Sequence, residues 1–372
     1  MNKHNFLIKL IISIGVVITT LGCSCTKISS SLTNPPSRST STSAGLTNIL
    51  SPTDAETNTL TSDKPYEKSR IVAYVTWDSY ENIWDNGKDL NSEPSLAYIT
   101  DLIGPAVVPH STSDPYIEGK DGSLNAFSVM RNVATNHGLT IAPYLYMPMS
   151  ELVDIISKGK LENMVSSLSV FLTTYNLDGV SLDVENSVDA DSMSELIDAV
   201  YNKIHSDRRF IDVAGFGYGS LNVAQTEESK IRYVQVMCYD LWWYPDQSAD
   251  YPQASIVDAE TGTAAWNNAG WAKSKILMGI PFYGRTASED TLHYAKIVDL
   301  LHPSDLTDEG IINGQKYWWG GKNTDEMKAK WVIQNNYPGV MIFDMGYDDL
   351  NTSYSLLKKI FDTFNSASSL IK

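Results

Sequence analysis

One apolar segment of the chain carries two carboxylates at alternate positions. Residues 180–185 read VSLDVE, so aliphatic residues alternate with Ser181, Asp183 and Glu185. Because successive side chains of a β-strand point to opposite faces, these three polar side chains lie on one face. Burying carboxylates is costly unless they are paired or used, and a crowded pair keeps one member protonated near neutral pH. The segment therefore predicts acid–base chemistry.

The regions around this segment alternate between strand-like and helix-like patterns, beginning at Arg70. Strands alternating with helices predict the α/β class and, over this length, a (β/α)8 TIM barrel whose active site lies at the carboxyl ends of the strands. A doubly wound open sheet is the alternative, but no glycine-rich phosphate loop follows any strand. The expected strands are residues 71–77, 96–103, 139–147, 177–186, 210–214, 233–237, 276–279 and 340–343, and the expected helices are residues 123–137, 151–175, 191–206 and 350–364.

Four segments resemble glycoside hydrolase family 18, the chitinase family. The family signature is Asp-Gly-x-Asp-x-Asp-x-Glu, and residues 178–185 read DGVSLDVE, with Ser181 in place of the middle Asp. Residues 237–240 (MCYD), 279–285 (GIPFYGR) and 339–343 (GVMIF) resemble three later segments of the family, with Phe343 where a Trp is usual. All four lie at the ends of expected strands and in the family's order.

The resemblance implies a retaining, substrate-assisted hydrolysis of β-1,4-linked N-acetylglucosamine polymers, in which the sugar's own acetamide oxygen attacks. Glu185 is then the acid/base, and Asp183 forms a hydrogen bond with Glu185 or with the acetamide. Tyr239 and Asp240 hold the acetamide and stabilise the positive intermediate. Aromatic rings pack on sugar faces and polar groups bind the hydroxyls. The expected substrate-binding residues are Trp77, Tyr146, Ser181, Met237, Trp242, Trp243, Tyr283, Arg285 and Phe343.

Several roles stay open at this point. Arg285 either binds sugar hydroxyls or pairs with an acid, and Ser181 is expected to keep one uncharged hydrogen bond to Asp183. Tyr244, Trp318 and Trp319 also count among the groove aromatics, whereas Trp266, Trp271 and Trp331 are assigned to core packing.

Two features of the sequence depart further from the family and affect the groove. Residues 141–146 lack the Ser-x-Gly-Gly of many members, and the segment between Arg285 and Val340 is too short for a full α+β insertion domain. We therefore expect an open, shallow groove. The alternatives are an endo-β-N-acetylglucosaminidase acting on N-glycans or peptidoglycan-derived glycan, and a non-catalytic carbohydrate-binding barrel. The retained Glu185 favours an enzyme.

The first 69 residues predict export rather than a folded domain. Lys3 and Lys9 precede a short apolar run that ends at Gly22-Cys23, which is typical of a lipoprotein signal peptide over residues 1–22 with Cys23 as the lipid anchor. Residues 23–69 are rich in Ser, Thr and Pro and predict a disordered tether, followed by a catalytic domain over residues 70–367. We expect an extracytoplasmic, membrane-anchored protein, or a secreted one if Cys23 is not lipidated.

Composition excludes several other classes. A net charge of −16 argues against nucleic-acid binding and suits a neutral substrate, and six scattered histidines predict no metal site and no cofactor. Three cysteines are too few for a disulfide framework, and Cys238 reads as a small buried hydrophobe. We expect a monomer that contacts the membrane only through its N-terminal lipid.

Overall fold

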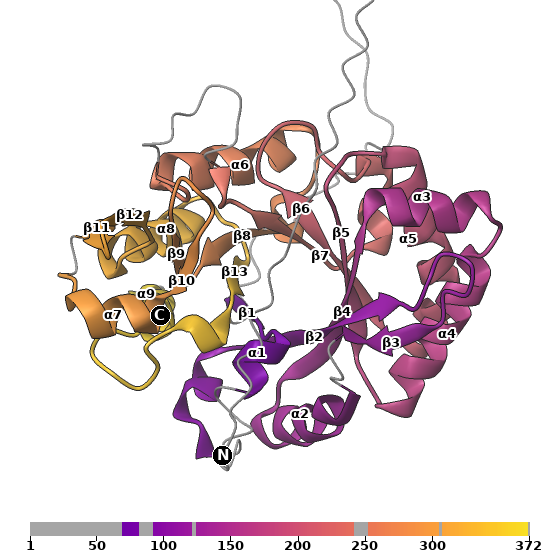
Figure 1. Cartoon of the computed structure of the whole chain (residues 1–372), viewed down its shortest axis with the longest axis horizontal. Helices are drawn as coiled ribbons and strands as arrows, with labels where there is room; N and C mark the ends of the chain where they lie inside the picture. Colours follow the sequence, from indigo (N-terminus) through magenta and orange to yellow (C-terminus); the bar gives the residue numbers. More distant parts are fainter. Residues whose placement is uncertain (1–68, 82–91, 121–123, 242–251, 305–306, 371–372) are drawn as a thin grey trace, which may run out of the picture. The chain divides into compact units, whose positions relative to one another are not determined.

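Eight parallel strands close into a barrel, as Figure 1 shows, so the prediction of a TIM barrel is confirmed. The computed structural model describes residues 69–81, 92–120, 124–241, 252–304 and 307–370. The strand order is β1-β13-β8-β7-β6-β5-β4-β2, and pairing of β1 with β2 completes the circle. The barrel strands are β1 (Arg70–Tyr74), β2 (Asp101–Pro109), β4 (Thr140–Pro148), β5 (Gly179–Glu185), β6 (Phe210–Phe216), β7 (Tyr233–Met237), β8 (Ile276–Pro281) and β13 (Gly339–Phe343).

Helices surround the barrel (Figure 1) and bury the outward faces of the strands. Val180, Leu182 and Val184 of β5 belong to this outer core, whereas a second apolar cluster fills the barrel interior around Tyr74 and Tyr144. The alternation predicted for β5 is thus observed, with the polar side chains turned inward. The surrounding helices are α2 (Leu124–His137), α3 (Met149–Ser157), α4 (Leu161–Thr174), α5 (Ala190–Ile204), α6 (Ile256–Asn268), α8 (Lys322–Gln334) and α9 (Leu356–Leu370).

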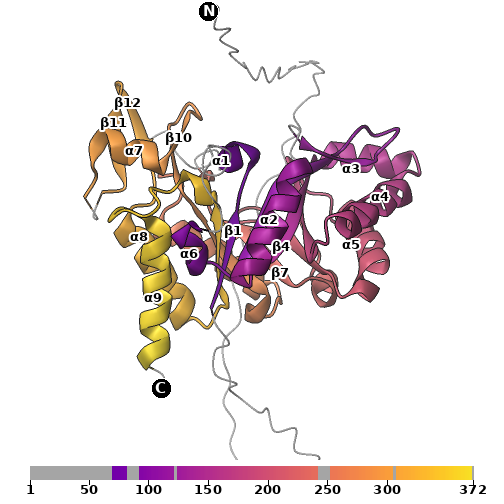
Figure 2. The same ribbon diagram turned by 90° about the horizontal axis from the view of Figure 1, so that it is seen from below.

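A small insertion follows β8. Its antiparallel sheet has the order β10-β9-β12-β11, and Figure 2 shows it on the same side of the barrel as α1 (Trp77–Tyr80), which follows the carboxyl end of β1. The sequence predicted no full insertion domain, and it did not anticipate this smaller one. The insertion consists of β9 (Tyr283–Arg285), β10 (Thr291–His293), α7 (Tyr294–Leu301), β11 (Glu309–Ile312) and β12 (Gln315–Trp318).

Two expected elements begin later than the hydrophobic pattern suggests. The strand expected from residue 96 begins at Asp101, because Pro94–Tyr98 forms a 3-10 helix whose N-cap, Glu93, accepts a hydrogen bond from the Ser95 N–H. The helix expected from residue 350 begins at Leu356, where the Asp348 carboxylate accepts the first free backbone N–H groups. Capping residues, which hydropathy ignores, set both boundaries. A short strand outside the barrel, β3 (Ile117–Gly119), pairs antiparallel with the last residues of β2.

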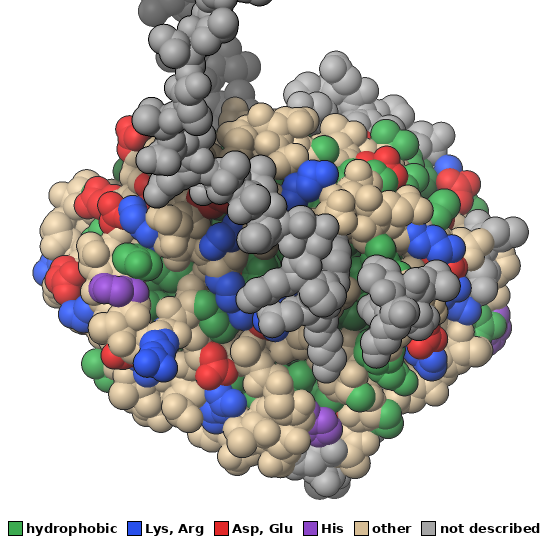
Figure 3. Space-filling view, turned by 180° about the vertical axis from the view of Figure 1, so that it is seen from behind, with side chains coloured by type: hydrophobic (Ala, Val, Ile, Leu, Met, Phe, Trp, Pro, Cys, Tyr) green, Lys and Arg blue, Asp and Glu red, His purple; other side chains and the backbone are tan. Residues whose placement is uncertain are grey.

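One face of the molecule shows no single dominant charge. On the face turned away from the viewer of Figure 1, acidic and basic side chains are interspersed (Figure 3), although the chain carries a net charge of −16. Within the described ranges, no helix combines the length and the apolar character needed to cross a bilayer.

A buried ion pair in α8 gives a first prediction about stability. Asp325 and Lys328 have side chains that are 0% exposed and 3.2 Å apart, and burial raises the pKa of Asp325 to about 6 although Lys328 opposes that shift. Removing one member of such a pair leaves an uncompensated charge, so Lys328→Met should lower the free energy of unfolding by about 3 kcal/mol. Urea denaturation at pH 8 measures this loss.

The pH dependence and a matched variant check the cause. Losing Lys328 raises the pKa of Asp325 further in the folded state, so the deficit should shrink as pH falls below that pKa and Asp325 becomes neutral. Lys330→Met, on the exposed face of the same helix, should change stability by less than about 0.5 kcal/mol. A Lys328→Met deficit that is equal at pH 5 and pH 8 would contradict the explanation.

Candidate functional site

The two carboxylates of β5 form a hydrogen-bonded pair at the carboxyl end of the strand. Asp183 is buried and hydrogen-bonded to Glu185, which is half-buried. Burial, followed by the nearby Glu185 charge, raises the pKa of Asp183 well above its usual range. Burial also raises the pKa of Glu185, and the Asp240 charge adds to the rise while the hydrogen bond with Asp183 opposes it. The pair therefore retains a proton that a single exposed carboxylate would lose.

This pair lines a cavity of about 320 Å³ in the mouth of the barrel. Strands far apart in the sequence supply its walls, so that hydroxyl, carboxylate and aromatic groups converge on one space. A concave site with a few polar groups among aromatic rings is typical of a small-molecule or sugar pocket. Its lining residues are Tyr74, Thr76, Lys120, Tyr144, Tyr146, Asp183, Glu185, Ala214, Met237, Tyr239, Asp240, Tyr283, Met341 and Phe343.

Asp240 is held from two sides at the end of β7. The Tyr283 hydroxyl donates a hydrogen bond to Asp240 Oδ1 at a distance of 2.9 Å, and Arg285 Nη1 lies 2.5 Å from Asp240 Oδ2. Burial raises the pKa of Asp240, and Arg285 opposes that shift. Asp240 has a φ of 62°, a left-handed conformation that costs energy in a residue with a side chain and is common at functional sites. Arg285 thus pairs with an acid, which is one of its two predicted roles, and its binding of sugar hydroxyls stays a prediction.

Tyr239 enters the cavity across Gly279 on the neighbouring strand. A Cβ atom at Gly279 would lie 3.1 Å from the Tyr239 ring and 2.3 Å from the Val236 carbonyl oxygen. Only a glycine allows this close approach, so the predicted motif on β8 has a packing role in positioning Tyr239.

Comparison with known proteins agrees with this geometry. A sequence profile described as "Glycosyl hydrolases family 18" matches residues 150–348, more than half of the chain and the region that carries both carboxylates. The chain belongs to glycosyl hydrolase family 18. An endochitinase of Brugia malayi is 25% identical over 322 residues, which cover 70% of this chain and 63% of that protein.

Solved structures of the family share the fold. A chitinase from Bacteroides thetaiotaomicron superimposes with a TM-score of 0.67 at 22% identity, covering 80% of this chain and 96% of that one. A family 18 chitinase from Cycas revoluta, solved in complex with (GlcNAc)3, gives 0.66 at 14% identity, covering 80% of this chain and 100% of that one. At such identities the likeness concerns the fold alone.

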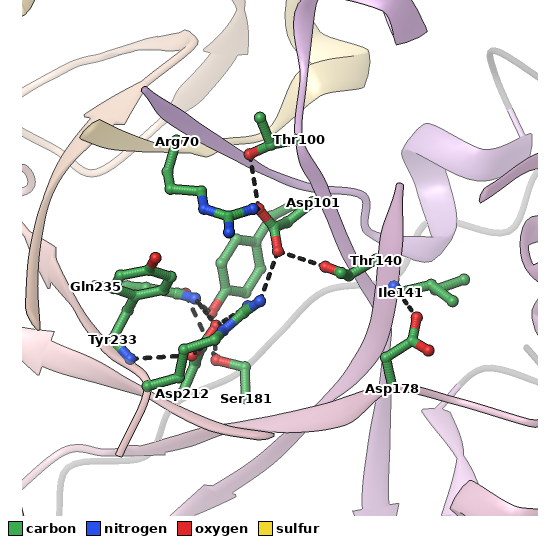
Figure 4. A network of polar contacts seen from close by, with 12 residues as sticks. Arg70, Thr100, Asp101, Thr140, Ile141, Asp178, Ser181, Asp212, Tyr233 and Gln235 are labelled. Atoms are coloured by element: carbon green, nitrogen blue, oxygen red, sulfur yellow. Dashed lines mark hydrogen bonds and ion pairs between the residues drawn. The ribbon is translucent and has the colours of Figure 1, made fainter. Parts of the chain in front are cut away.

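This family 18 barrel departs from the family signature at Ser181, and the expected hydrogen bond from Ser181 to Asp183 is not observed. Ser181 Oγ instead lies 2.8 Å from the Tyr74 hydroxyl and 3.5 Å from Gln235 Oε1. Toward the amino ends of the strands, Gln235 forms a hydrogen bond with Asp212, and Arg232 links Asp212 to Asp101 (Figure 4). The position of the missing Asp is therefore the top of a buried polar network.

Asp178, the first residue of the signature, has a structural role. Its Oδ2 lies outside the cavity and accepts hydrogen bonds from the Ile141 N–H and from Arg131 Nη1, each with a donor–acceptor distance of 2.8 Å. These bonds tie the start of β5 to β4 and α2.

A second cavity of about 650 Å³ adjoins the first. Glu185, Tyr239 and Asp240 border both, so the second cavity continues the first past the carboxylate pair. Arg285 lines only the second cavity, beside Phe216 and Tyr218, whose rings stack at 6.1 Å. Together the two cavities form a groove long enough for more than one sugar ring.

The predicted aromatic residues divide into four groups. Phe343 lines the cavity with its ring 5.7 Å from Tyr74, and Trp77 lines a small adjoining cavity and stacks on Tyr80. The prediction that Trp318 and Trp319 line the groove is wrong, because neither lines the two cavities and both are buried in or beside the insertion. Trp242, Trp243 and Tyr244 lie outside the described residues, as does Cys23. Trp266, Trp271 and Trp331 pack in or against the core, as expected.

Tyr74, Lys120, Tyr144 and Gln235 are among the residues at or beneath the cavity that sequence reasoning missed. Tyr144 shares the inward face of β4 with Tyr146, which was predicted, and period-two alternation could have found it. Gln235 is a polar residue within an otherwise apolar strand, and such a residue is buried only when it is hydrogen-bonded. Lys120 gives no signal in the sequence, because it reaches the cavity from the end of β3.

Proposed function

We propose that this protein is a chitinase-like glycoside hydrolase that cleaves β-1,4-linked N-acetylglucosamine polymers with retention of configuration. The observation that supports it best is the carboxylate pair: Glu185 at the cavity wall, hydrogen-bonded to a buried Asp183 with a raised pKa. Family membership agrees with this activity, as do the relatives described above, an endochitinase and two chitinases.

The proposed reaction has two steps. In the first, the proton that the pair shares passes from Asp183 to Glu185 and on to the glycosidic oxygen as the glycosidic bond breaks, while the substrate's acetamide oxygen attacks the anomeric carbon and forms an oxazolinium ion. Asp183 is left ionised. In the second, the Glu185 carboxylate removes a proton from a water molecule whose oxygen attacks the anomeric carbon. The bond from that carbon to the acetamide oxygen breaks, which opens the oxazolinium ring, and the acid is restored. Tyr239 and Asp240 line the space for the acetamide, and Asp183 Oδ1, buried without a partner among the described residues, can accept the acetamide N–H.

Product analysis tests this function. Chitin oligomers, a high-mannose glycopeptide and peptidoglycan glycan strands should be offered side by side, with NMR detection of the first anomer released. The proposal expects cleavage of chitin oligomers with a β-anomeric product. An α-anomer at early times would refute substrate assistance, and binding of all three substrates without cleavage would indicate a carbohydrate-binding barrel.

One residue favours a second substrate, peptidoglycan-derived glycan. Lys120 Nζ lies 4.7 Å from the centre of the Tyr146 ring, and Lys120 lines both the main cavity and the small one beside Trp77. No described carboxylate forms an ion pair with it. Its ammonium group is therefore available to a carboxylate on a bound sugar, which N-acetylmuramic acid carries and chitin lacks.

Lys120→Gln separates the two substrates. We expect kcat/KM on a peptidoglycan glycan strand to fall about tenfold or more, with a change of less than about threefold on chitin oligomers, because only the former loses a charge-assisted hydrogen bond. Equal losses on both substrates would assign Lys120 to the carboxylate pair instead, since its charge lowers the pKa of Asp183 and of Glu185.

We further propose that the protein is exported and anchored through Cys23. The support is the sequence alone, in which a short apolar run ends in Gly22-Cys23. Cys23→Ser should abolish labelling by a palmitate analogue and move the protein out of the membrane fraction or leave it unprocessed. Unchanged labelling and unchanged membrane partition would argue against Cys23 as the anchor.

A further inference from the structure

The polar network that includes Ser181 starts from Asp212, a carboxylate that accepts as many hydrogen bonds as it can. Asp212 Oδ1 accepts from Arg232 Nε at 2.9 Å and from the Tyr233 N–H at 3.1 Å, and its Oδ2 accepts from Arg232 Nη2 at 2.6 Å and from Gln235 Nε2 at 2.9 Å. Four donors fill the four lone-pair directions of an ionised carboxylate. Asp212 therefore acts only as an acceptor here, and this fixes the orientation of the Gln235 amide.

The fixed amide sets the direction of the hydrogen bonds that run from Gln235 through Tyr74 to Ser181. Because the Gln235 NH2 group points to Asp212, the amide oxygen points away from Asp212 and accepts a hydrogen bond from the Tyr74 hydroxyl at 2.5 Å. The single proton of Tyr74 is then used, so in the 2.8 Å contact with Ser181 it is Ser181 that donates. Ser181 in turn has no proton left for Asp183, its neighbour on the same face of β5.

An independent observation agrees with this direction. Asp183 Oδ1 is buried and accepts no hydrogen bond from any described residue, which is costly for an ionised carboxylate. Given the function proposed above, we propose that Gln235 is a positioning residue of the reaction. It commits the Ser181 proton to Tyr74 and so leaves Asp183 without a hydrogen bond from Ser181. The proton that Asp183 and Glu185 share is therefore kept on Asp183.

The other groups around Asp183 remain the same whichever way the chain of hydrogen bonds runs. Glu185 on β5 raises its pKa and Lys120, at the end of β3, lowers it. Neutral hydroxyls face it from β1, β4 and the end of β7, namely Tyr74, Tyr146 and Tyr239. A change confined to Gln235 therefore alters the donor beneath Asp183 and none of these charges.

Gln235→Met tests the proposal. Without the amide oxygen, the Tyr74 hydroxyl donates to Ser181, whose own proton is released to Asp183 Oδ1. A donor to the charged form lowers the pKa of Asp183, so the basic limb of kcat/KM should move to lower pH by about one unit. The same change made in a Ser181→Ala background should give no shift, because the hydroxyl that transmits it is absent. Thr140→Val, which removes one hydrogen bond to Asp101 at the far end of the network, should leave the profile unchanged.

Two outcomes would overturn the proposal: a Gln235→Met profile that superimposes on the wild type, or a shift of equal size in the Ser181→Ala background. If Gln235→Met does not fold, Tyr74→Phe, which also releases the Ser181 proton, should shift the limb in the same direction. Isotope-edited infrared titration of Asp183, with Asp183→Asn as the reference, needs no turnover. An inactive wild type would therefore refute the proposed function while the infrared pKa still decides the role of Gln235.

Discussion

Replacing Glu185 with Gln is expected to lower kcat on chitin oligomers by about 10³-fold while KM and Tm stay close to wild type. The amide matches the acid in shape and can still form a hydrogen bond with Asp183, but it cannot transfer a proton to the glycosidic oxygen. Substrate should therefore bind and remain uncleaved. Initial rates and isothermal titration calorimetry measure the two effects on the same protein.

Glu195→Gln is the matched control for the loss of a carboxylate. Glu195 is exposed on α5, outside the cavity, so its isosteric replacement should leave kcat unchanged. The wild-type profile should also have its basic limb above the ordinary range of a glutamate, because burial raises the pKa of both Asp183 and Glu185 and the pair keeps its shared proton to higher pH. Near wild-type turnover of Glu185→Gln would remove Glu185 from the role of acid.

The second large effect is expected for Asp183→Asn, with a loss of kcat of about 100-fold and little change in KM. In the free enzyme Asp183 is the more deeply buried member of the pair, and its raised pKa keeps it neutral beside Glu185. An asparagine reproduces that neutral state. It cannot develop the negative charge that opposes the oxazolinium ion, so the loss should fall on the chemical step.

The pH profile separates this effect from a packing defect. With Asn at 183 the pair no longer shares a proton, so the basic limb should report Glu185 alone and become a simple one-proton titration. A thiazoline analogue of N-acetylglucosamine, which mimics the oxazolinium ring, should lose more affinity for the variant than the substrate does. Equal losses for the analogue and the substrate would show that Asp183 positions the sugar and does not stabilise the intermediate.

Local patterns in the sequence account for much of the fold. Alternation along residues 180–185 correctly indicated which side chains of β5 face the barrel interior, because the period of two is a property of the extended backbone. Helix α2 was expected at residues 123–137 and runs over Leu124–His137. The late starts of β2 and α9 were missed because capping by Glu93 and Asp348 depends on single hydrogen bonds that hydrophobicity does not register.

The sequence by itself determined the barrel, the family and the set of residues that carry the proposed chemistry, since each lies in a short motif at the end of a strand. Only the tertiary structure decided that Arg285 pairs with Asp240, that Trp318 and Trp319 are buried, and that Ser181 bonds to Tyr74 and Gln235. Tyr74 lies 107 residues before Ser181, and Gln235 lies 54 residues after it. Closure of the barrel brings β1, β5 and β7 to one axis, and no local pattern encodes which inward side chains meet there.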